Sequence, residues 1–410
     1  MSINKRIFNI LVLLLAVLIP VGAADFGLML DQSIGTGGTE EVAFDYQANL
    51  IPRFSLLIGE QGEFIASAGL TVGYAGGFYI IPELLRTEFF WDFGSAAIST
   101  GRINYTSPFL YLADGLFDGA RFFYDTEFGT FSAAAFYTGL LYKKNAAIRI
   151  TTEDEDSFHD DIDYADLTDT YFSSRRLAMA FDWEHPALGS LVRTGASVFA
   201  QFDLNGRQEA VHSQYLAVYA GIPVNRFLFE LSGALMFAEN FFDNKPKSGS
   251  EFEIGFSGEA AAHYSLQTDF PSRVSFMVFY SGGKAESGPV AAFIPFTTTN
   301  LGNILQAKPS GIMILGLDYT ARLHQTFSAG LEFNYFLRTD LSTNWGLYPI
   351  SVPSEKYGLG GELFGQLMWN PFSDLRLNLG GGIFIPAMGD AAPKREPRWR
   401  VSLTALLALY

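Results

Sequence analysis

The sequence of 410 residues contains no cysteine. Disulfide frameworks, cysteine-ligated metal sites and thiol nucleophiles are therefore excluded. Basic residues are also scarce, because 27 Lys and Arg stand against 43 Asp and Glu, for a formal net charge of -16. Nucleic-acid binding needs a basic face, so this balance argues against it. The sequence also lacks a phosphate-binding loop, an HExxH motif and a GxSxG motif, and we expect neither enzyme activity nor a cofactor.

Long apolar runs are missing everywhere except at the N-terminus. Lys5 and Arg6 precede an apolar run from Ile7 to Ile19, and the small residues 21–24 follow it. This order is typical of a secretory signal peptide with its cleavage site. A retained helical anchor is the alternative, but the run is short for a bilayer span. We therefore expect a cleaved signal over 1–24, a mature chain over 25–410, and no transmembrane helix in the mature chain.

What the sequence does contain is aromatic residues and glycine in a repeating pattern of period two. It has 39 Phe and 41 Gly, and aromatics make up 15%. Between 226 and 238 the apolar residues fall on alternate positions and the polar ones between them: Phe227, Phe229, Leu231, Leu235 and Phe237 against Arg226, Glu230 and Ser232. Strict alternation is the period of a β-strand, and it recurs along most of the chain.

Three features indicate that these strands form a membrane barrel rather than a soluble sandwich. Many alternating runs extend well beyond the usual soluble strand of about five or six residues. Short turns alternate with longer loops along the chain, as in outer-membrane barrels. Trp91, Trp183 and Trp369 lie at the strand ends that meet short turns, where an interfacial aromatic belt is expected. The fold prediction is an all-β, single antiparallel transmembrane β-barrel.

Counting the alternating runs gives about eighteen strands, within a range of about sixteen to eighteen. The predicted strands are 25–33, 42–58, 63–75, 79–92, 96–105, 118–126, 130–142, 174–184, 191–203, 211–222, 226–238, 251–266, 272–281, 310–322, 326–338, 355–369, 374–386 and 398–410. An even number places both termini in the periplasm, with short periplasmic turns and longer external loops. We expect the outer membrane of a Gram-negative-type or spirochaete-type envelope, with its lipid and the barrel-assembly machinery as partners.

The predicted inward faces carry many charges, which indicates a water-filled lumen because burying charges without water is costly. The pore-lining candidates are Arg86, Glu88, Arg102, Arg121, Asp125, Arg176, Arg193, Arg226, Glu230, Glu253, Glu259, Arg273, Arg322, Glu332 and Arg376. This predicts a porin that passes small hydrophilic or anionic solutes, with saccharides among the candidates. The alternative is a surface adhesin or structural outer-membrane protein with a blocked lumen.

Two features leave alternatives open. Arg86, Arg102 and Arg121 lie on three successive predicted strands, either as a basic ladder for anions or as braces paired with carboxylates of the wall. Segment 106–117 is apolar for an external loop, and it fits either a lid folded inward or packing on the barrel rim.

The loop 143–173 is strongly acidic, and from Glu153 to Asp169 it contains no Lys or Arg. Oxygen ligands such as Asp156, Asp160, Asp161, Asp163 and Asp166 could bind Ca²⁺. The spacing lacks the glycine and the terminal Glu of an EF-hand loop. We therefore expect no metal site and favour a solvated or inward-folded loop.

Residues 100–137 resemble the alginate-export family of outer-membrane porins. The resemblance rests on Gly101-Arg102 in one strand, Phe117-Asp118-Gly119-Ala120-Arg121 in the next, and a hairpin that turns at Gly129. It implies an eighteen-stranded barrel that passes an anionic polysaccharide through an arginine-lined lumen, with Arg102 and Arg121 among the lumen arginines.

Overall fold

The computed structural model describes residues 24–39, 42–189, 191–206, 209–242, 245–246, 253–284, 290–341 and 355–409. The predicted signal peptide lies outside these residues except for Ala24, which begins the first strand, and it stays a prediction. Among the described residues, no helix is both long and apolar enough to cross a membrane.

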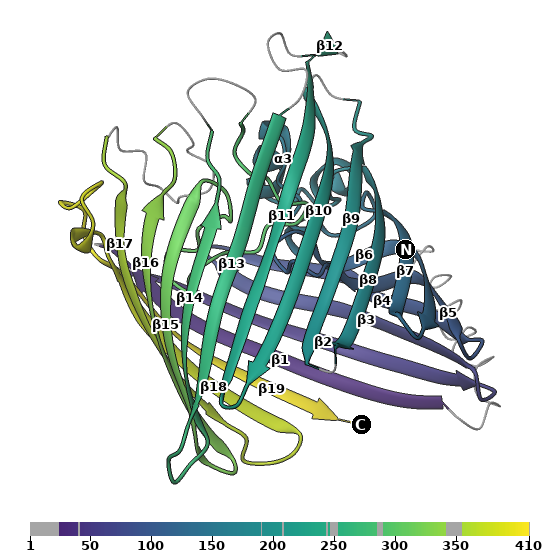
Figure 1. Cartoon of the computed structure of the whole chain (residues 1–410), viewed down its shortest axis with the longest axis horizontal. Helices are drawn as coiled ribbons and strands as arrows, with labels where there is room; N and C mark the ends of the chain where they lie inside the picture. The colour runs from purple at the N-terminus through teal and green to yellow at the C-terminus, as the bar shows by residue number, and fades with distance from the viewer. Residues whose placement is uncertain are drawn as a thin grey trace.

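The chain folds into one closed antiparallel barrel of eighteen long strands (Figure 1). Each long strand pairs with the next along the chain, and the last pairs with the first from Leu28–Leu409 to Gly38–Trp399. The strands are β1 (Ala24–Gly38), β2 (Val42–Ile58), β3 (Gly62–Ala75), β4 (Phe78–Asp92), β5 (Ala96–Thr106), β6 (Asp114–Thr126), β7 (Gly129–Tyr137), β8 (Arg176–Leu188), β9 (Val192–Asp203), β10 (Glu209–Val224), β11 (Phe227–Phe242), β13 (Glu253–Leu266), β14 (Ser272–Ser281), β15 (Ile312–His324), β16 (Phe327–Arg338), β17 (Gly358–Trp369), β18 (Leu375–Ile385) and β19 (Arg398–Leu409).

A few short elements complete the fold. The two-residue strand β12 (Lys245–Pro246) pairs antiparallel with the end of β11. Three short helices lie in one loop: α2 (Lys143–Ala146), α3 (Thr152–His159) and α4 (Leu167–Thr170). The 3-10 helix η1 (Pro386–Met388) follows β18. In Figure 1, β9–β17 form the near wall, while β1, β2 and β19 cross behind it.

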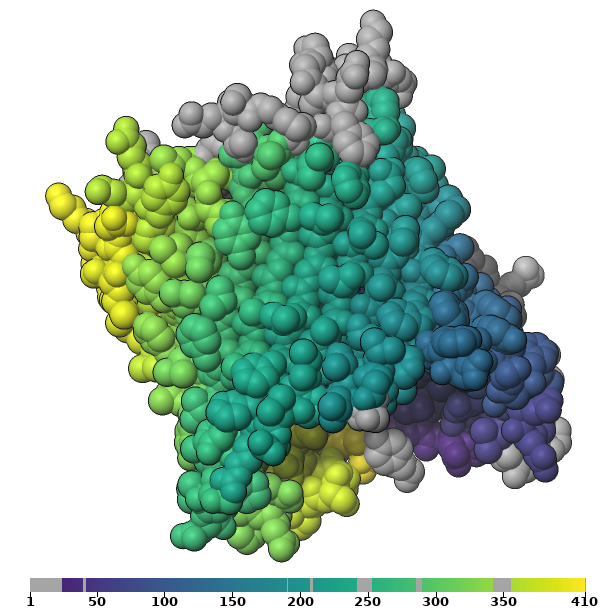
Figure 2. Space-filling view, in the orientation of Figure 1, coloured from purple at the N-terminus to yellow at the C-terminus, as the bar shows by residue number. Residues whose placement is uncertain are grey.

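The alternation read from the sequence sets the two faces of the wall. On β8, Met179 and Phe181 are about half exposed, whereas Ala178, Ala180 and Asp182 are buried. The same alternation places apolar side chains on the outside of the other strands, and the near wall presents a continuous surface of side chains (Figure 2). An apolar exterior on a closed barrel is what a lipid bilayer requires, because the backbone amides of the wall are paired within the sheet.

The predicted fold and strand count are confirmed, and each predicted run overlaps one strand. The observed strand ends differ from the predicted ones where contacts between distant residues determine the end of a strand. The predicted strand 130–142 stops at Tyr137, after which the chain leaves the wall, and the predicted strand 118–126 begins earlier, at Asp114. Proline acts as expected within a strand, since the β2–β3 ladder skips Ile51 and Pro52, and proline has no amide hydrogen to donate.

Three loops fold into the barrel and pack together. We call them the inner partition: residues 107–113, 138–175 and 290–311. Phe109, Leu112, Phe293 and Phe296 are almost fully buried in one apolar cluster. The backbone N–H of Phe296 donates to the carbonyl of Leu112 (2.8 Å). The apolar segment 106–117 therefore turns inward over residues 107–113, between β5 and β6, and the inner partition occupies part of the lumen.

Candidate functional site

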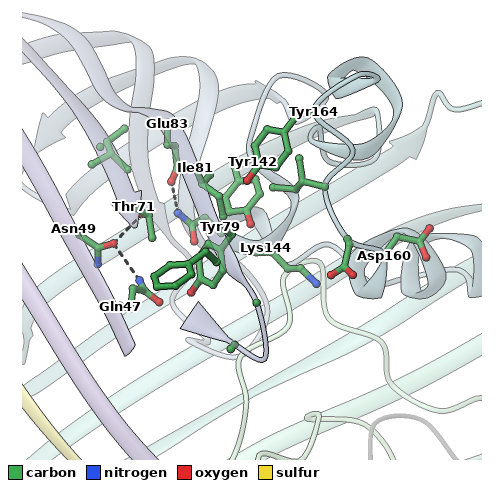
Figure 3. Close-up of a pocket in the computed structure, with 18 of the residues that line it drawn as sticks. Gln47, Asn49, Thr71, Tyr79, Ile81, Glu83, Tyr142, Lys144, Asp160 and Tyr164 are labelled. Atoms are coloured by element: carbon green, nitrogen blue, oxygen red, sulfur yellow. Dashed lines mark hydrogen bonds between the residues drawn. The ribbon is translucent and has the colours of Figure 1, made fainter. Parts of the chain in front are cut away.

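A large cavity lies inside the barrel between the wall and the inner partition (Figure 3). This upper cavity has a volume of about 960 Å³ and is lined by inward residues of β2, β3 and β4 together with residues of the loop after β7. Gln47, Asn49 and Thr71 line one side, and a hydrogen bond of 2.8 Å joins the last two. Lys144 and Asp160 line the other side, so the lining is polar and of mixed charge.

Tyrosines are prominent in the upper cavity. Tyr79, Tyr142 and Tyr164 all line it, and Asn145 donates to Glu83 across it (2.5 Å). Burial raises the pKa of Tyr142, so its hydroxyl stays protonated and can donate. None of these tyrosines was among the candidates read from the sequence. Alternation puts Tyr79 on the inner face of β4, but nothing local shows that the loop folds back onto it.

A second cavity, the basic cavity, lies next to the upper one along β4. It has a volume of about 330 Å³, and its charged lining residues are the arginines Arg86 and Arg121 and the glutamates Glu63 and Glu88, with Ser99 beside them. Arg86 is held to Glu88 (2.5 Å), which also accepts from Ser99 (2.6 Å). Arg121 pairs with Asp182 (3.1 Å). The side chain of Arg86 is 40% exposed and that of Arg121 is 15% exposed, so Arg86 is the more accessible of the two to a solute.

Arg102 is built into the wall. Its guanidinium makes two hydrogen bonds of 2.8 Å with the carboxylate of Asp118, which lies directly opposite on β6. It also donates to the carbonyls of Leu84 and Leu140, and the residue is only 6% exposed. Arg102 lines neither the upper cavity nor the basic cavity. All three arginines of the ladder therefore have carboxylate partners.

A third cavity, the vestibule, lies at the end of the barrel that has short turns. Its volume is about 460 Å³, and Arg273, Arg322 and Gln366 line it. Arg322 also donates to the carbonyl of Gln325 (3.0 Å) in the turn between β15 and β16. Arg273 and Arg322, two of the predicted pore-lining residues, thus line the cavity at the short-turn end of the barrel.

The remaining candidates are scattered through the barrel. Arg176 is fully buried against Asp154 (2.6 Å) and Asp203 (2.9 Å). Glu230 contacts His263 (2.9 Å), and Glu259 accepts from Tyr111 of the inner partition (2.8 Å). The others have these places: Asp125 accepts from Thr130, Arg193 stacks on Tyr219, Arg226 lies in the turn before β11, Glu253 accepts from Asn240, Glu332 accepts from Asn303, and Arg376 donates to Asn370.

The acidic loop is ordered by its own carboxylates. Asp154 and Thr151 form a capping box at the start of α3, as such pairs do at helix N-termini. Asp160 and Asp161 line the upper cavity, Asp156 is exposed, and Asp163 and Asp166 accept backbone N–H groups in turns. Within the described part of the chain, no three His, Cys, Asp or Glu side chains are grouped so that they could hold a metal ion.

An ion cluster joins two loops of the inner partition. Glu155 on α3 accepts from Arg149 (2.8 Å) and from Lys308. Burial opposes the charge of Glu155, but hydrogen bonds from Arg149 and Lys308 outweigh it and lower its pKa to about 2. Burial lowers the pKa of Lys308 to about 8, and the bond to Glu155 limits that fall. Glu362 on β17 similarly accepts the backbone N–H groups of residues 303–305. These contacts hold the partition in the lumen.

The sequence matches no family model and no curated protein. Solved structures of Pseudomonas aeruginosa proteins share its fold. OccK2 (OpdF) in complex with glucuronate aligns with a TM-score of 0.64 at 11% identity, covering 95% of this chain and 98% of that one. OccK5 (OpdH) gives 0.61 at 11% identity, covering 95% and 99%. OprD gives 0.57 at 11% identity, covering 95% and 96%.

These likenesses define the class of the fold: an eighteen-strand outer-membrane barrel of the OccK/OprD porin type. The expected outer-membrane location is confirmed by this fold and by the apolar exterior.

Proposed function

We propose that the protein is a substrate-selective porin that passes small hydrophilic solutes through its narrowed lumen. One observation carries the proposal: the upper and basic cavities follow one another along β4. Leu85 lines the upper cavity, and the next residue, Arg86, lines the basic cavity. Polar cavities stacked along one wall of a barrel form the kind of route that a water-soluble molecule needs.

We further propose that anionic solutes, and uronates among them, are preferred at the basic cavity. The exposed guanidinium of Arg86 supports this preference, since Arg binds carboxylates in a planar geometry. The resemblance of residues 100–137 to alginate-export porins points to the same chemistry. OccK2, which shares the fold, has been solved in complex with glucuronate, and this also supports a uronate. The partners that we expect are outer-membrane lipid and the barrel-assembly machinery.

Single-channel recording in planar bilayers tests the porin proposal. We expect stepwise conductance, and we expect proteoliposomes to take up glucuronate faster than glucose. The inner partition favours one alternative, a surface protein with a blocked lumen. An absence of conductance steps at every voltage, from protein shown to be folded, would contradict the porin proposal and favour that alternative. Steps with equal uptake of both sugars would contradict only the anion preference.

A further inference from the structure

The hydrogen-bonded wall is incomplete between β4 and β5. The ladder between these strands runs from Asp92–Ala97 to Thr87–Arg102 and stops there. β4 continues back to Phe78 without a partner strand on this side. The far end of β5 leans inward instead, where Ile103 and Tyr105 are buried in the apolar cluster. We call the free edge of β4 over residues 80–84 the seam.

Side chains, rather than a neighbouring strand, cover the seam. The hydroxyl of Tyr164 contacts both the N–H (3.1 Å) and the carbonyl (3.2 Å) of Ile80. The hydroxyl of Tyr171 donates to the carbonyl of Pro82 (2.7 Å). Arg102 donates to the carbonyl of Leu84. Proline suits this edge because it has no N–H that would need a partner.

The seam separates lipid from the upper cavity by one layer of protein. On the outer side Ile80 and Leu84 of β4 are 53% and 51% exposed. On the inner side Tyr79 and Ile81 line the upper cavity. Tyr164 contributes both to the cavity and to the seam, because it lines the cavity and its hydroxyl bonds to the edge of β4 at Ile80. Movement of this loop would join the cavity to the outside of the barrel.

The height of the seam places it at the outer boundary of the hydrocarbon region. Trp91 lies at the short-turn end of β4, where aromatic side chains mark the interface. A strand that rises about 3.3 Å per residue and is tilted by about 40° gains about 2.5 Å of height per residue. Leu84 is then about 18 Å above Trp91 and Ile80 about 28 Å above it. The apolar band is about 25 Å tall, so Leu84 faces its outer half and Ile80 lies just above it, at the level of the lipid head groups.

The two ends of the seam are held differently. Arg102 and Asp118 fix the lower end through a buried ion pair with two hydrogen bonds. Above Leu84 the seam is held by two tyrosine hydroxyls, from a loop whose residues 163–169 are all exposed, and by Asn145, which donates to Glu83 (2.5 Å). Such single hydroxyl contacts contribute little stability each. The seam can therefore open from its upper end while its lower end stays closed.

We propose that the seam is a lateral port through which an amphiphile enters the upper cavity from the outer leaflet. The charged residues that line the cavity are Glu83, Asp160 and Asp161 against Lys144. This excess of carboxylates fits a zwitterionic or cationic head group and disfavours an anionic one. The acyl chain would remain between the exposed apolar residues of the seam. This route enters the upper cavity from the side, and the axial path of the proposed porin crosses the same cavity.

The test uses the absence of native cysteine. A single Asn145→Cys variant carries a bimane fluorophore inside the upper cavity, and vesicles contain phosphatidylcholine brominated on its acyl chains. Bromine quenches only at near contact, so quenching reports lipid in the cavity whether or not the barrel conducts. Leu363→Cys, on the lipid-facing side of β17, is the positive control. Gln366→Cys, in the vestibule, is the negative control.

We expect quenching at position 145 to lie well above that at position 366 and below that at position 363. The double change Tyr164→Phe and Tyr171→Phe removes two hydroxyl contacts and should raise the open population by about tenfold. Tyr124→Phe, on the lipid-facing side of β6, is the matched control and should change nothing. Brominated phosphatidylglycerol, with its anionic head, should quench less than phosphatidylcholine.

Three results would overturn parts of this proposal. Quenching at position 145 no greater than at position 366 would show that lipid does not enter. Equal quenching with and without the two tyrosine hydroxyls would show that the seam is not the route. Equal quenching by both lipids would contradict the head-group preference. Gel mobility with and without heating confirms that each variant is folded before it is compared.

Discussion

The guanidinium of Arg102 lies opposite the carboxylate of Asp118 and forms two hydrogen bonds of 2.8 Å with it. The pair closes the point where β4 and β5 separate, because Arg102 also donates to the carbonyls of Leu84 and Leu140. One side chain thus joins two strands and the inner partition. The pair of Arg102 and Asp118 therefore has a structural role in this chain.

Replacing Arg102 with Lys should destabilise the barrel. Lysine keeps the charge but loses the planar two-bond geometry and leaves Asp118 or a carbonyl without a donor. We expect the free energy of unfolding to fall by about 2 kcal/mol, measured by urea unfolding from phospholipid vesicles. Arg376→Lys, at an exposed position, is the control and should have little effect. Equal stability of the two variants would show that the wall does not depend on the pair.

Gly101, the neighbour of Arg102, should tolerate no side chain. Its φ of 112° lies in the region that favours glycine, and a Cβ added there would lie 2.0 Å from the carbonyl oxygen of Thr87. Gly101→Ala should therefore cost about 3 kcal/mol of unfolding free energy or prevent assembly. Gly365→Ala is the matched control, because its nearest atoms lie at 3.9 Å. Similar folding yields of the two variants would contradict this reading of the motif.

Features that depend on neighbouring residues could be predicted from the sequence, and features that depend on contacts between distant residues could not. The strands were predictable because alternation is a local property of each segment, and it holds on β8 and β11 as on the others. The inner partition was not, because it depends on contacts such as Lys308 with Glu155, which lie 153 residues apart.

The arginine ladder shows the same limit at the level of single residues. Arg86, Arg102 and Arg121 lie on successive strands, and the sequence left open whether they attract anions or brace the wall. The structure pairs them with Glu88, Asp118 and Asp182 and leaves them differently exposed. Arg102 is buried because the hydrogen-bonded pairing of β4 with β5 ends at this residue. No pattern within β5 predicts where that pairing ends.

Acid should loosen the inner partition through Glu155. Its pKa is about 2 in the folded protein against an ordinary value of 4.5, so the folded state favours the carboxylate. The stabilisation is complete above about pH 4.5 and is lost as the pH falls towards 2. We expect the unfolding free energy of the native protein to drop over this window, and Glu155→Gln to lack that part of the drop. Asp156→Asn, at the exposed neighbouring position, should follow the native profile, and a native-like profile for Glu155→Gln would contradict the prediction.

Arg86 should control ion preference more than any other arginine of the ladder. It lines the basic cavity with 40% of its side chain exposed, and its removal leaves the buried carboxylate of Glu88 without its partner. We therefore expect Arg86→Gln to lower the ratio of anion to cation permeability by about twofold, measured as the reversal potential in a salt gradient. Arg193→Gln is the matched control, because Arg193 stacks on Tyr219 away from this cavity. The conductance of both variants should stay close to native, since neither residue holds the inner partition. If the two variants shift the reversal potential equally, selectivity arises from the overall charge of the barrel and not from the basic cavity.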